Sequence, residues 1–465
     1  MSARRALGIW LLLFAVYGTT LGLDAAPSSD YGAGEAHQLL VAESLVSDGD
    51  LDLTDEYRTR AYDAWYSPTL QPAALATAGH IHEPPGAGFG LLIAPAYAVA
   101  GPIGVELMLA AIAALAFVLA IALARRLVPD PWATAGPLVV ALSPPALAHA
   151  TTVTPELTAG ALLAGAALAA LRVRDRPRGQ TAALAGLLVA ALPWLDPLYL
   201  VPGAVVLLAM SRWLVRLHRG LAALVGIEIT FASLVLYVSI NGRFYGSLTP
   251  YAAALPGQSP TDADFPGGYA DRAYRLIALW FDADVGLLRW SPFLAMAFFA
   301  LWLLWRSRRD HMARAVPDQA DVEVTAALLA SIAGAQIFVA AFLSVAMFGP
   351  WFPAPGLIAA LPVAAPLAAW GLRHAPRVGA VLAAITLAGS LWLILELRLG
   401  SGGLAPPDSE APWGPLVGVF PAYRGGSAWG DIVIAVTVAT LVVLGAREWH
   451  RRRQSIAAAR QAPAP

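Results

Sequence analysis

The stretch GAGEAHQ, residues 32–38, sets a carboxylate and an imidazole just beyond a long apolar run. Glu35 and His37 can take a proton from an attacking hydroxyl, so the pattern indicates a general-base site. Each residue also has an ordinary alternative. The helix dipole favours a glutamate in a first turn, and a histidine at a membrane surface can simply be solvated. Two residues apart on a helix lie about 200° around its axis, so both face one substrate only if the helix begins after Glu35.

A second polar group, His80, His82 and Glu83, directly precedes an apolar run at residues 87–100. These side chains could ligate a metal, but alternate residues of an extended segment share one side without closing a tetrahedral site. We therefore predict no metal here and expect His82 and Glu83 to form a polar lip beside a substrate cleft. The apolar run is short for a membrane span, which predicts an interfacial or re-entrant element.

Three aspartates, Asp48, Asp50 and Asp52, alternate along the segment SDGDLDL. Such spacing could suggest calcium, but the loop pattern of an EF-hand is incomplete because no glutamate stands at its twelfth position. The pattern favours a solvated turn. Before it, residues 35–47 carry apolar side chains at helical spacing, which predicts a short amphipathic helix at the membrane surface.

Three charged residues stand at the predicted ends of membrane helices. Glu156 follows Pro155, so it is either a functional acid at membrane depth or an ordinary helix start. Arg243 and Arg289 could each bind a lipid phosphate by charge-assisted hydrogen bonds. Headgroup anchoring explains both arginines equally well.

The composition is that of a membrane protein with many spans. Of 465 residues, 58% are hydrophobic and 13% are charged, and the mean hydropathy is +0.63. With no cysteine, disulfides and thiolate sites are excluded. The short basic loops hold no Gly-rich phosphate cradle, so we expect neither a nucleotide cofactor nor a nucleic-acid partner.

Apolar runs long enough to cross a bilayer predict an all-α polytopic membrane protein with about 12 transmembrane helices. Residues 1–446 form one transmembrane domain, and 447–465 form a basic tail. The first external loop, 24–102, holds surface helices, and further external loops lie at 241–289 and 397–428. The predicted spans are roughly 6–23, 103–124, 131–149, 154–172, 180–195, 198–215, 220–240, 290–305, 322–346, 355–372, 378–396 and 429–446.

The basic residues, all of them arginine, predict the orientation. With this set of spans, 22 of the 30 arginines fall on the side of the N-terminus and 8 on the other. The positive-inside rule then places both termini in the cytoplasm. The first span could be a signal peptide, but its apolar core of about 18 residues is longer than usual, which favours a retained anchor. Arginine without lysine, beside abundant alanine, is typical of GC-rich bacteria, so a bacterial plasma membrane is expected.

The order of these features resembles the GT-C integral-membrane glycosyltransferases, which use polyprenyl-phosphate sugars. The resemblance rests on "GEAHQLLVAESLVSDGDLDLTDEY", "HEPPGAGFGLLIAPAYAVAGP", "LSPPALAHATTVTPELTAGALL", "LPWLDPLYLVPGAVVLL", "NGRFYGSLTPYAAA", "LWFDADVGLLRWSPFL" and "FGPWFPAPGLIAALPVAAPLA", and it covers nearly the whole chain. It implies a polyprenyl-phosphate sugar donor, contact with membrane lipid, and a glycan, lipid or protein acceptor whose hydroxyl attacks at the outer face.

Three positions depart from that family's pattern. The aspartate expected as base falls on Gly34, which leaves Glu35 and His37, with Asp30 upstream as a substitute. Leu357 stands where many relatives have arginine, and Asp196 where many have a basic residue. The resemblance therefore predicts a glycosyltransferase, or an inactive relative that binds lipid or glycan. A transporter fits less well, because the polar residues gather in external loops. A divalent metal is compatible with the sequence but is not indicated.

Overall fold

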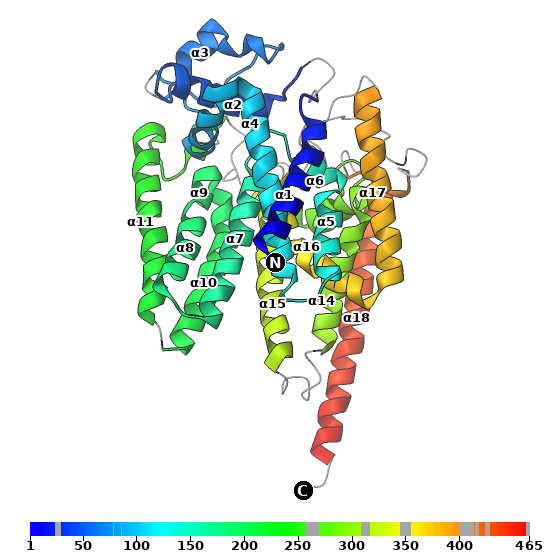
Figure 1. Ribbon diagram of the computed structural model, residues 1–465. Helices are drawn as coiled ribbons and strands as arrows, with labels where there is room; N and C mark the ends of the chain where they lie inside the picture. The colour runs from blue at the N-terminus through cyan, green and yellow to red at the C-terminus, as the bar shows by residue number, and fades with distance from the viewer. Residues whose placement is uncertain are drawn as a thin grey trace.

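The computed structural model describes residues 1–23, 29–77, 79–84, 86–218, 220–255, 269–307, 317–344, 355–399, 413, 418–423 and 428–461. The fold is a bundle of helices, with α2 and α3 at the end remote from the C-terminus (Figure 1). In the described residues, β-type pairing is limited to two isolated bridges, Ala74 with Ala254 and Thr77 with His80.

The α-helices, in chain order, are α1 (Ala3–Tyr17), α2 (Ala33–Ser47), α3 (Thr54–Thr59), α4 (Ala87–Ala124), α5 (Trp132–Ala141), α6 (Pro144–Ala148), α7 (Glu156–Asp175), α8 (Gly179–Ala190), α9 (Leu192–Leu195), α10 (Leu200–Arg216), α11 (Gly220–Tyr245), α12 (Arg275–Phe281), α13 (Leu287–Trp290), α14 (Ala295–Ser307), α15 (Pro317–Phe338), α16 (Leu361–His374), α17 (Pro376–Leu399) and α18 (Ala428–Gln461).

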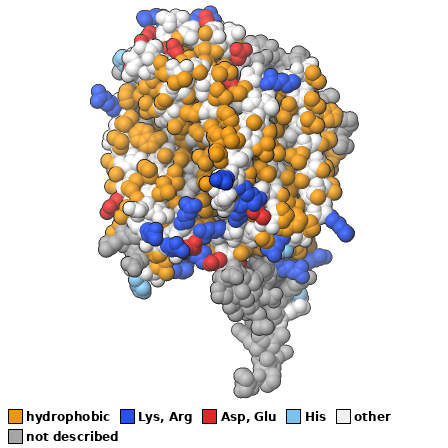
Figure 2. Space-filling model, viewed as in Figure 1, with side chains coloured by type: hydrophobic (Ala, Val, Ile, Leu, Met, Phe, Trp, Pro, Cys, Tyr) orange, Lys and Arg blue, Asp and Glu red, His pale blue; other side chains and the backbone are white. Residues whose placement is uncertain are grey.

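Eight helical segments are long and apolar enough to cross a membrane: Ala87–Ala124, Glu156–Asp175, Pro197–Arg216, Leu224–Ala253, Asp321–Leu343, Gly356–His374, Pro376–Leu399 and Ala428–Arg447. Three shorter apolar segments, Trp132–Ala141, Gly179–Leu195 and Pro292–Arg306, coincide with further predicted spans, as does α1. On the face shown in Figure 2, hydrophobic side chains cover most of the middle, and charged side chains gather mainly above and below them. A helical, polytopic membrane protein is therefore confirmed, whereas the number of spans stays a prediction.

The segments predicted to be cytoplasmic meet at one end of the bundle through ion pairs. Arg5 and Arg125 both bind Asp130, at 3.0 and 2.9 Å, and Arg126 lies 2.6 Å from Asp175. The N-terminal segment, the turn after α4 and the end of α7 thus share one side of the molecule. This arrangement agrees with the grouping of arginines in the sequence, and the membrane sidedness of the termini stays a prediction. The predicted tail continues α18 as far as Gln461.

A kink divides α4 where the sequence separates its apolar run from the next span. Ala100 leaves the helical conformation, and Gly101 has φ +61°, a left-handed value that glycine adopts without a steric penalty. Pro102 follows at once. The arm before the kink packs tightly on its neighbours: a Cβ at Gly90 would lie 2.3 Å from Val41 Cγ1 of α2. Glycine at this position therefore allows α2 to approach α4 closely.

The prediction of an amphipathic surface helix at 35–47 is wrong in one respect. The helix exists as α2, but its residues from Glu35 to Ala42 are all buried. One side packs on α4, and Leu53, Tyr62 and Leu70 from the following segment join the same hydrophobic core. The sequence pattern could not anticipate a segment that folds back over the helix, so α2 is an internal element of the segment predicted as the first external loop.

Candidate functional site

Glu35 lies in the first turn of α2 and uses both of its carboxylate oxygens to hold the backbone. Oε2 accepts a 2.9 Å hydrogen bond from the amide of Gly32, the N-cap residue, and Oε1 accepts a 2.7 Å bond from the amide of Val153. Burial raises the pKa of Glu35 to about 8, and the charges of Glu106 and Glu156 add to the rise, while the two amides lower it. Glu35 therefore joins the start of α2 to the segment before α7.

Glu35 and His37 face different partners, because α2 begins at Ala33, before both residues. His37 Nδ1 lies 2.7 Å from the hydroxyl of Tyr57 in α3, and that hydroxyl donates a short hydrogen bond to Glu83 Oε1. Since Tyr57 gives its single proton to Glu83, His37 must donate to Tyr57. The structure thus brings the predicted residues His37 and Glu83 together, with a tyrosine between them that the sequence reading missed.

Glu83 is the centre of this buried network, with 3% of its surface exposed. Besides Tyr57, its Oε1 accepts a 3.2 Å bond from the Ala73 amide and lies 3.4 Å from His37 Nδ1. Oε2 has no hydrogen-bond partner among the described residues. Burial, with the charge of Glu83, raises the pKa of Tyr57 well above its ordinary value, so Tyr57 stays a donor.

His82 anchors the loop rather than lining a described pocket. Its Nδ1 lies 2.7 Å from the carbonyl oxygen of Leu51, and its ring stacks on His80 and meets the edges of Phe244 and Tyr245 at the end of α11. His80 binds Asp52 instead, at 2.6 Å. The predicted role of His82 at a substrate cleft stays a prediction.

Asp30 lines an open pocket of about 420 Å³ beside the kink of α4. The walls combine two carboxylates with aromatic rings and small apolar side chains. The lining residues are Asp30, Tyr31, Glu43, Ala61, Ala64, Trp65, Tyr97, Ala100, Pro102 and Ile103. Asp30 is exposed, unlike Glu35, so its carboxylate can meet a molecule from outside. Aromatic faces beside carboxylates suit a sugar, which offers both C–H faces and hydroxyl donors.

Glu106 in α4 supports the wall of this pocket, and the sequence reading missed it. Its side chain is buried, accepts a short hydrogen bond from the hydroxyl of Tyr31, and accepts a 3.2 Å bond from the Gly22 amide. The available signal was a lone acid in a strongly apolar run, a placement that is costly unless it is compensated.

Two further acids are half-buried, Glu156 close enough to act on the charge of Glu35, and Asp196 close enough to act on Glu156. Glu156, at the start of α7, has its Oε2 buried without a hydrogen-bond partner among the described residues. Asp196 accepts 2.7 Å bonds from the Leu198 amide and from the hydroxyl of Tyr251. Asp196 therefore caps the turn that opens at Pro197.

The two predicted phosphate ligands occupy different environments. Arg243 is exposed near the end of α11. Arg289 is buried, donates a short bond to the Ala283 carbonyl, and stacks over the Trp290 ring with 4.6 Å from its guanidinium carbon to the centroid. Neither arginine is among the described residues that line the Asp30 pocket. The group of described side chains that could share a metal ion, Asp48, Asp55 and Glu56, lies elsewhere and includes none of the predicted site residues.

The fold resembles that of a known membrane protein. The chain matches the crystal structure of ArnT from Cupriavidus metallidurans in the apo state, with a TM-score of 0.53 and 14% sequence identity. The match covers 88% of this chain and 67% of that one. No protein-family model and no curated protein matches the sequence. The chain therefore has a GT-C-like fold, as its motifs predicted.

Proposed function

We propose that this protein is a glycosyltransferase that moves a sugar from a polyprenyl-phosphate donor to an acceptor hydroxyl at the outer face of a bacterial plasma membrane. The GT-C-like fold and the apolar helices support the class of the enzyme. Because one fold can host several functions, the proposal depends on the site. The observation that carries it is the position of Asp30, an exposed carboxylate in an aromatic-walled pocket beside the kink of α4.

In the proposed reaction, Asp30 accepts the proton of the acceptor hydroxyl as its oxygen attacks the sugar carbon. The bond between that carbon and the donor phosphate breaks, and the lipid phosphate leaves with its electron pair. A prenyl tail keeps the donor phosphate at headgroup depth, so the base must lie where helices leave the membrane. Arg243 is proposed to bind this phosphate, because its guanidinium is exposed near the end of α11.

Glu35 and His37 have supporting roles in this proposal. Glu35 has both oxygens engaged by backbone amides, so it shapes the start of α2 and leaves the base function to Asp30. His37 reaches Glu83 through Tyr57. It thereby holds residues 53–70, which we call the covering segment, against α2. Glu156, Arg289 and His82 are proposed to maintain the inner walls of the substrate region.

The test is sugar transfer by the purified full chain from synthetic polyprenyl-phosphate hexoses and pentoses. Removing a general base typically slows turnover about 10²- to 10⁴-fold, so we expect that loss in Asp30→Asn with donor binding retained. Asp63→Asn, which changes an exposed carboxylate paired with Arg60, is the matched control and should transfer normally. Unchanged turnover in Asp30→Asn would exclude Asp30 as the base.

A second candidate function is binding of the lipid-linked sugar without transfer. It is favoured by Gly34, which replaces the family's aspartate, and by the engagement of Glu35 with the backbone. A wild-type protein that binds the donor and releases no polyprenyl phosphate with any acceptor would establish this function instead.

A further inference from the structure

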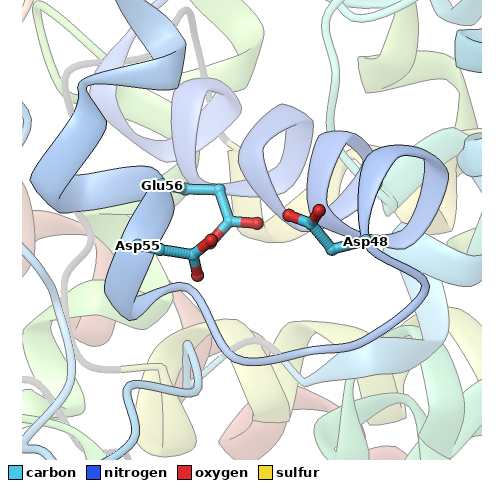
Figure 3. Close-up of side chains that lie close together, drawn as sticks. All are labelled: Asp48, Asp55 and Glu56. Carbon is cyan, nitrogen blue, oxygen red and sulfur yellow. The ribbon is translucent and has the colours of Figure 1, made fainter.

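We propose that Asp48, Asp55 and Glu56 bind a divalent cation, Ca²⁺, which fastens α3 to the end of α2. The three carboxylates converge across the turn that joins the two helices (Figure 3). This site is separate from the Asp30 pocket, so it does not depend on the proposed transfer reaction.

The spacing of the carboxylates fits a shared cation. One oxygen from each of the three residues lies within 4.8 Å of the others. Two oxygens that bind one Ca²⁺ at about 2.3–2.6 Å can be at most about 5 Å apart, when they lie on opposite sides of the ion. The three oxygens can therefore all reach a single Ca²⁺ with little movement of the backbone.

Glu56 supplies the strongest observation. The residue is only 3% exposed, yet neither of its carboxylate oxygens has a hydrogen-bond partner among the described residues. In Figure 3 its carboxylate points toward Asp55 and Asp48. A buried charge without a partner is costly, and two further carboxylates beside it increase the repulsion. A cation would supply the missing partner and remove this repulsion.

The neighbouring aspartates carry most of the hydrogen bonds of the loop, whereas the carboxylates of the three acids take part only through a 3.4 Å bond from the Ser47 hydroxyl to Asp48 Oδ2 among the described residues. Asp50 accepts bonds from the Ser44 hydroxyl and the Asp52 amide. Asp52 accepts bonds from the amides of Thr54 and Ile81. Asp50 and Asp52 thus fold the turn, while the carboxylates of Asp48, Asp55 and Glu56 are turned toward one another.

The donor set selects a hard cation. All three ligands are carboxylate oxygens, which suit Ca²⁺ better than the soft metals that prefer sulfur or imidazole. Asp48 is exposed and Asp55 is half-buried, so water can complete the coordination shell. Ca²⁺ takes six to eight oxygens in flexible arrangements, whereas Mg²⁺ demands an almost regular octahedron.

The cation would also influence the hydrogen bonds that join His37, Tyr57 and Glu83, because one of its ligands is next to Tyr57 in the chain. Tyr57 follows Glu56 directly, and its hydroxyl connects His37 with Glu83. Fixing Glu56 therefore fixes the start of α3 and holds Tyr57 against α2. We expect a structural cation that orders the covering segment of the first external loop.

The test is direct binding to the full chain in detergent after treatment with a chelator. Tb³⁺, which replaces Ca²⁺ and emits when an aromatic ring lies close, should give a saturable signal through Tyr57, and Ca²⁺ should displace it. Asp48→Asn and Asp55→Asn should each weaken Ca²⁺ binding about tenfold or more, because affinity follows the charge of the ligands. Neither side chain buttresses the core, so both variants should fold. Asp63→Asn is the control and should bind as the wild type does.

A thermal unfolding series supplies the second measurement. Since Ca²⁺ binds the folded state, about 5 mM Ca²⁺ should raise the unfolding midpoint of the wild type and of Asp63→Asn, but not that of the double variant Asp48→Asn with Asp55→Asn. The proposal is overturned if wild-type protein gives no Tb³⁺ signal that Ca²⁺ displaces, or if the Asp48 and Asp55 variants bind Ca²⁺ like the wild type.

Discussion

Two buried glutamates in the segment before α4, Glu35 and Glu56, make opposite use of the same side chain. Each is 3% exposed. Glu35 accepts one backbone amide at each oxygen, whereas Glu56 has no hydrogen-bond partner among the described residues and faces two other acids. Burial alone therefore does not distinguish a structural carboxylate from one prepared for a ligand. The partners of its oxygens do.

Glu83 falls between these two cases. Its Oε1 has Tyr57 and the Ala73 amide as partners, while its Oε2 has none among the described residues. Among the described residues, both carboxylate oxygens of Glu35 have hydrogen-bond partners, one oxygen of Glu83 does, and neither oxygen of Glu56 does. The three glutamates thus form a graded series. Variants along this series test whether the partners of the carboxylate oxygens cause the contrast between Glu35 and Glu56.

The largest expected effect on stability comes from Glu35→Ala. This change leaves the amides of Gly32 and Val153 without acceptors, and an unsatisfied buried amide costs about 1–3 kcal/mol. Glu56→Ala removes an equal volume and leaves no amide of another described residue without its acceptor. In a buffer with chelator, Glu35→Ala should therefore lose about 2–4 kcal/mol more unfolding free energy than Glu56→Ala. Denaturant titration in micelles measures both, and equal losses would contradict the contrast.

The next largest expected effect is the change of unfolding free energy with pH that the raised pKa of Glu35 should cause. Its pKa is about 8 in the fold and 4.5 ordinarily, so the folded state keeps a proton that the unfolded state releases. The stabilisation is complete below pH 4.5 and is lost as the pH rises through 8, by about 1.4 kcal/mol per unit inside that window. Glu35→Gln should remove the part of this slope that Glu35 contributes and leave the part due to Glu56, whose pKa burial raises to about 7, whereas Glu43→Gln should preserve the whole slope. A wild-type curve that stays flat across the window would refute the assignment.

The sequence predicted the helical elements better than their surroundings. Long apolar runs identified α4, α7 and the other membrane helices, because hydropathy and length are local properties. The same approach predicted an amphipathic α2, since it could not see that the following segment, including Leu53 and Tyr62, folds back over the helix. The helical spacing of apolar residues within one segment does not reveal that another segment of the chain will cover its polar side.

For the site, sequence reasoning found the acids but not their pairing. Glu83 and His37 were both selected, yet Tyr57, which connects them, carries no signal in its own neighbourhood. The sequence favoured a solvated turn at Asp48, Asp50 and Asp52 over an EF-hand, and this stays a prediction. However, the acids that converge are Asp48, Asp55 and Glu56, because the turn places the start of α3 beside the end of α2. The approach of these three acids depends on how the turn reverses the direction of the chain, and their spacing in the sequence does not reveal it.

The smallest expected effect comes from Tyr57→Phe, which shifts Glu83 one step toward the state of Glu56. The variant removes the hydroxyl between His37 and Glu83, but the Ala73 amide still serves Glu83 Oε1, so the loss should be about 1 kcal/mol. Tyr62→Phe, in the same row of rings, is the control and should lose less. The stabilisation by Ca²⁺ should persist in Tyr57→Phe, because all three carboxylates remain. If Tyr57→Phe abolished the stabilisation by Ca²⁺, the effect of the cation would depend on the Tyr57 hydroxyl. The cation site at the end of α2 and the hydrogen bonds of His37 near the start of α2 would then not be independent of each other.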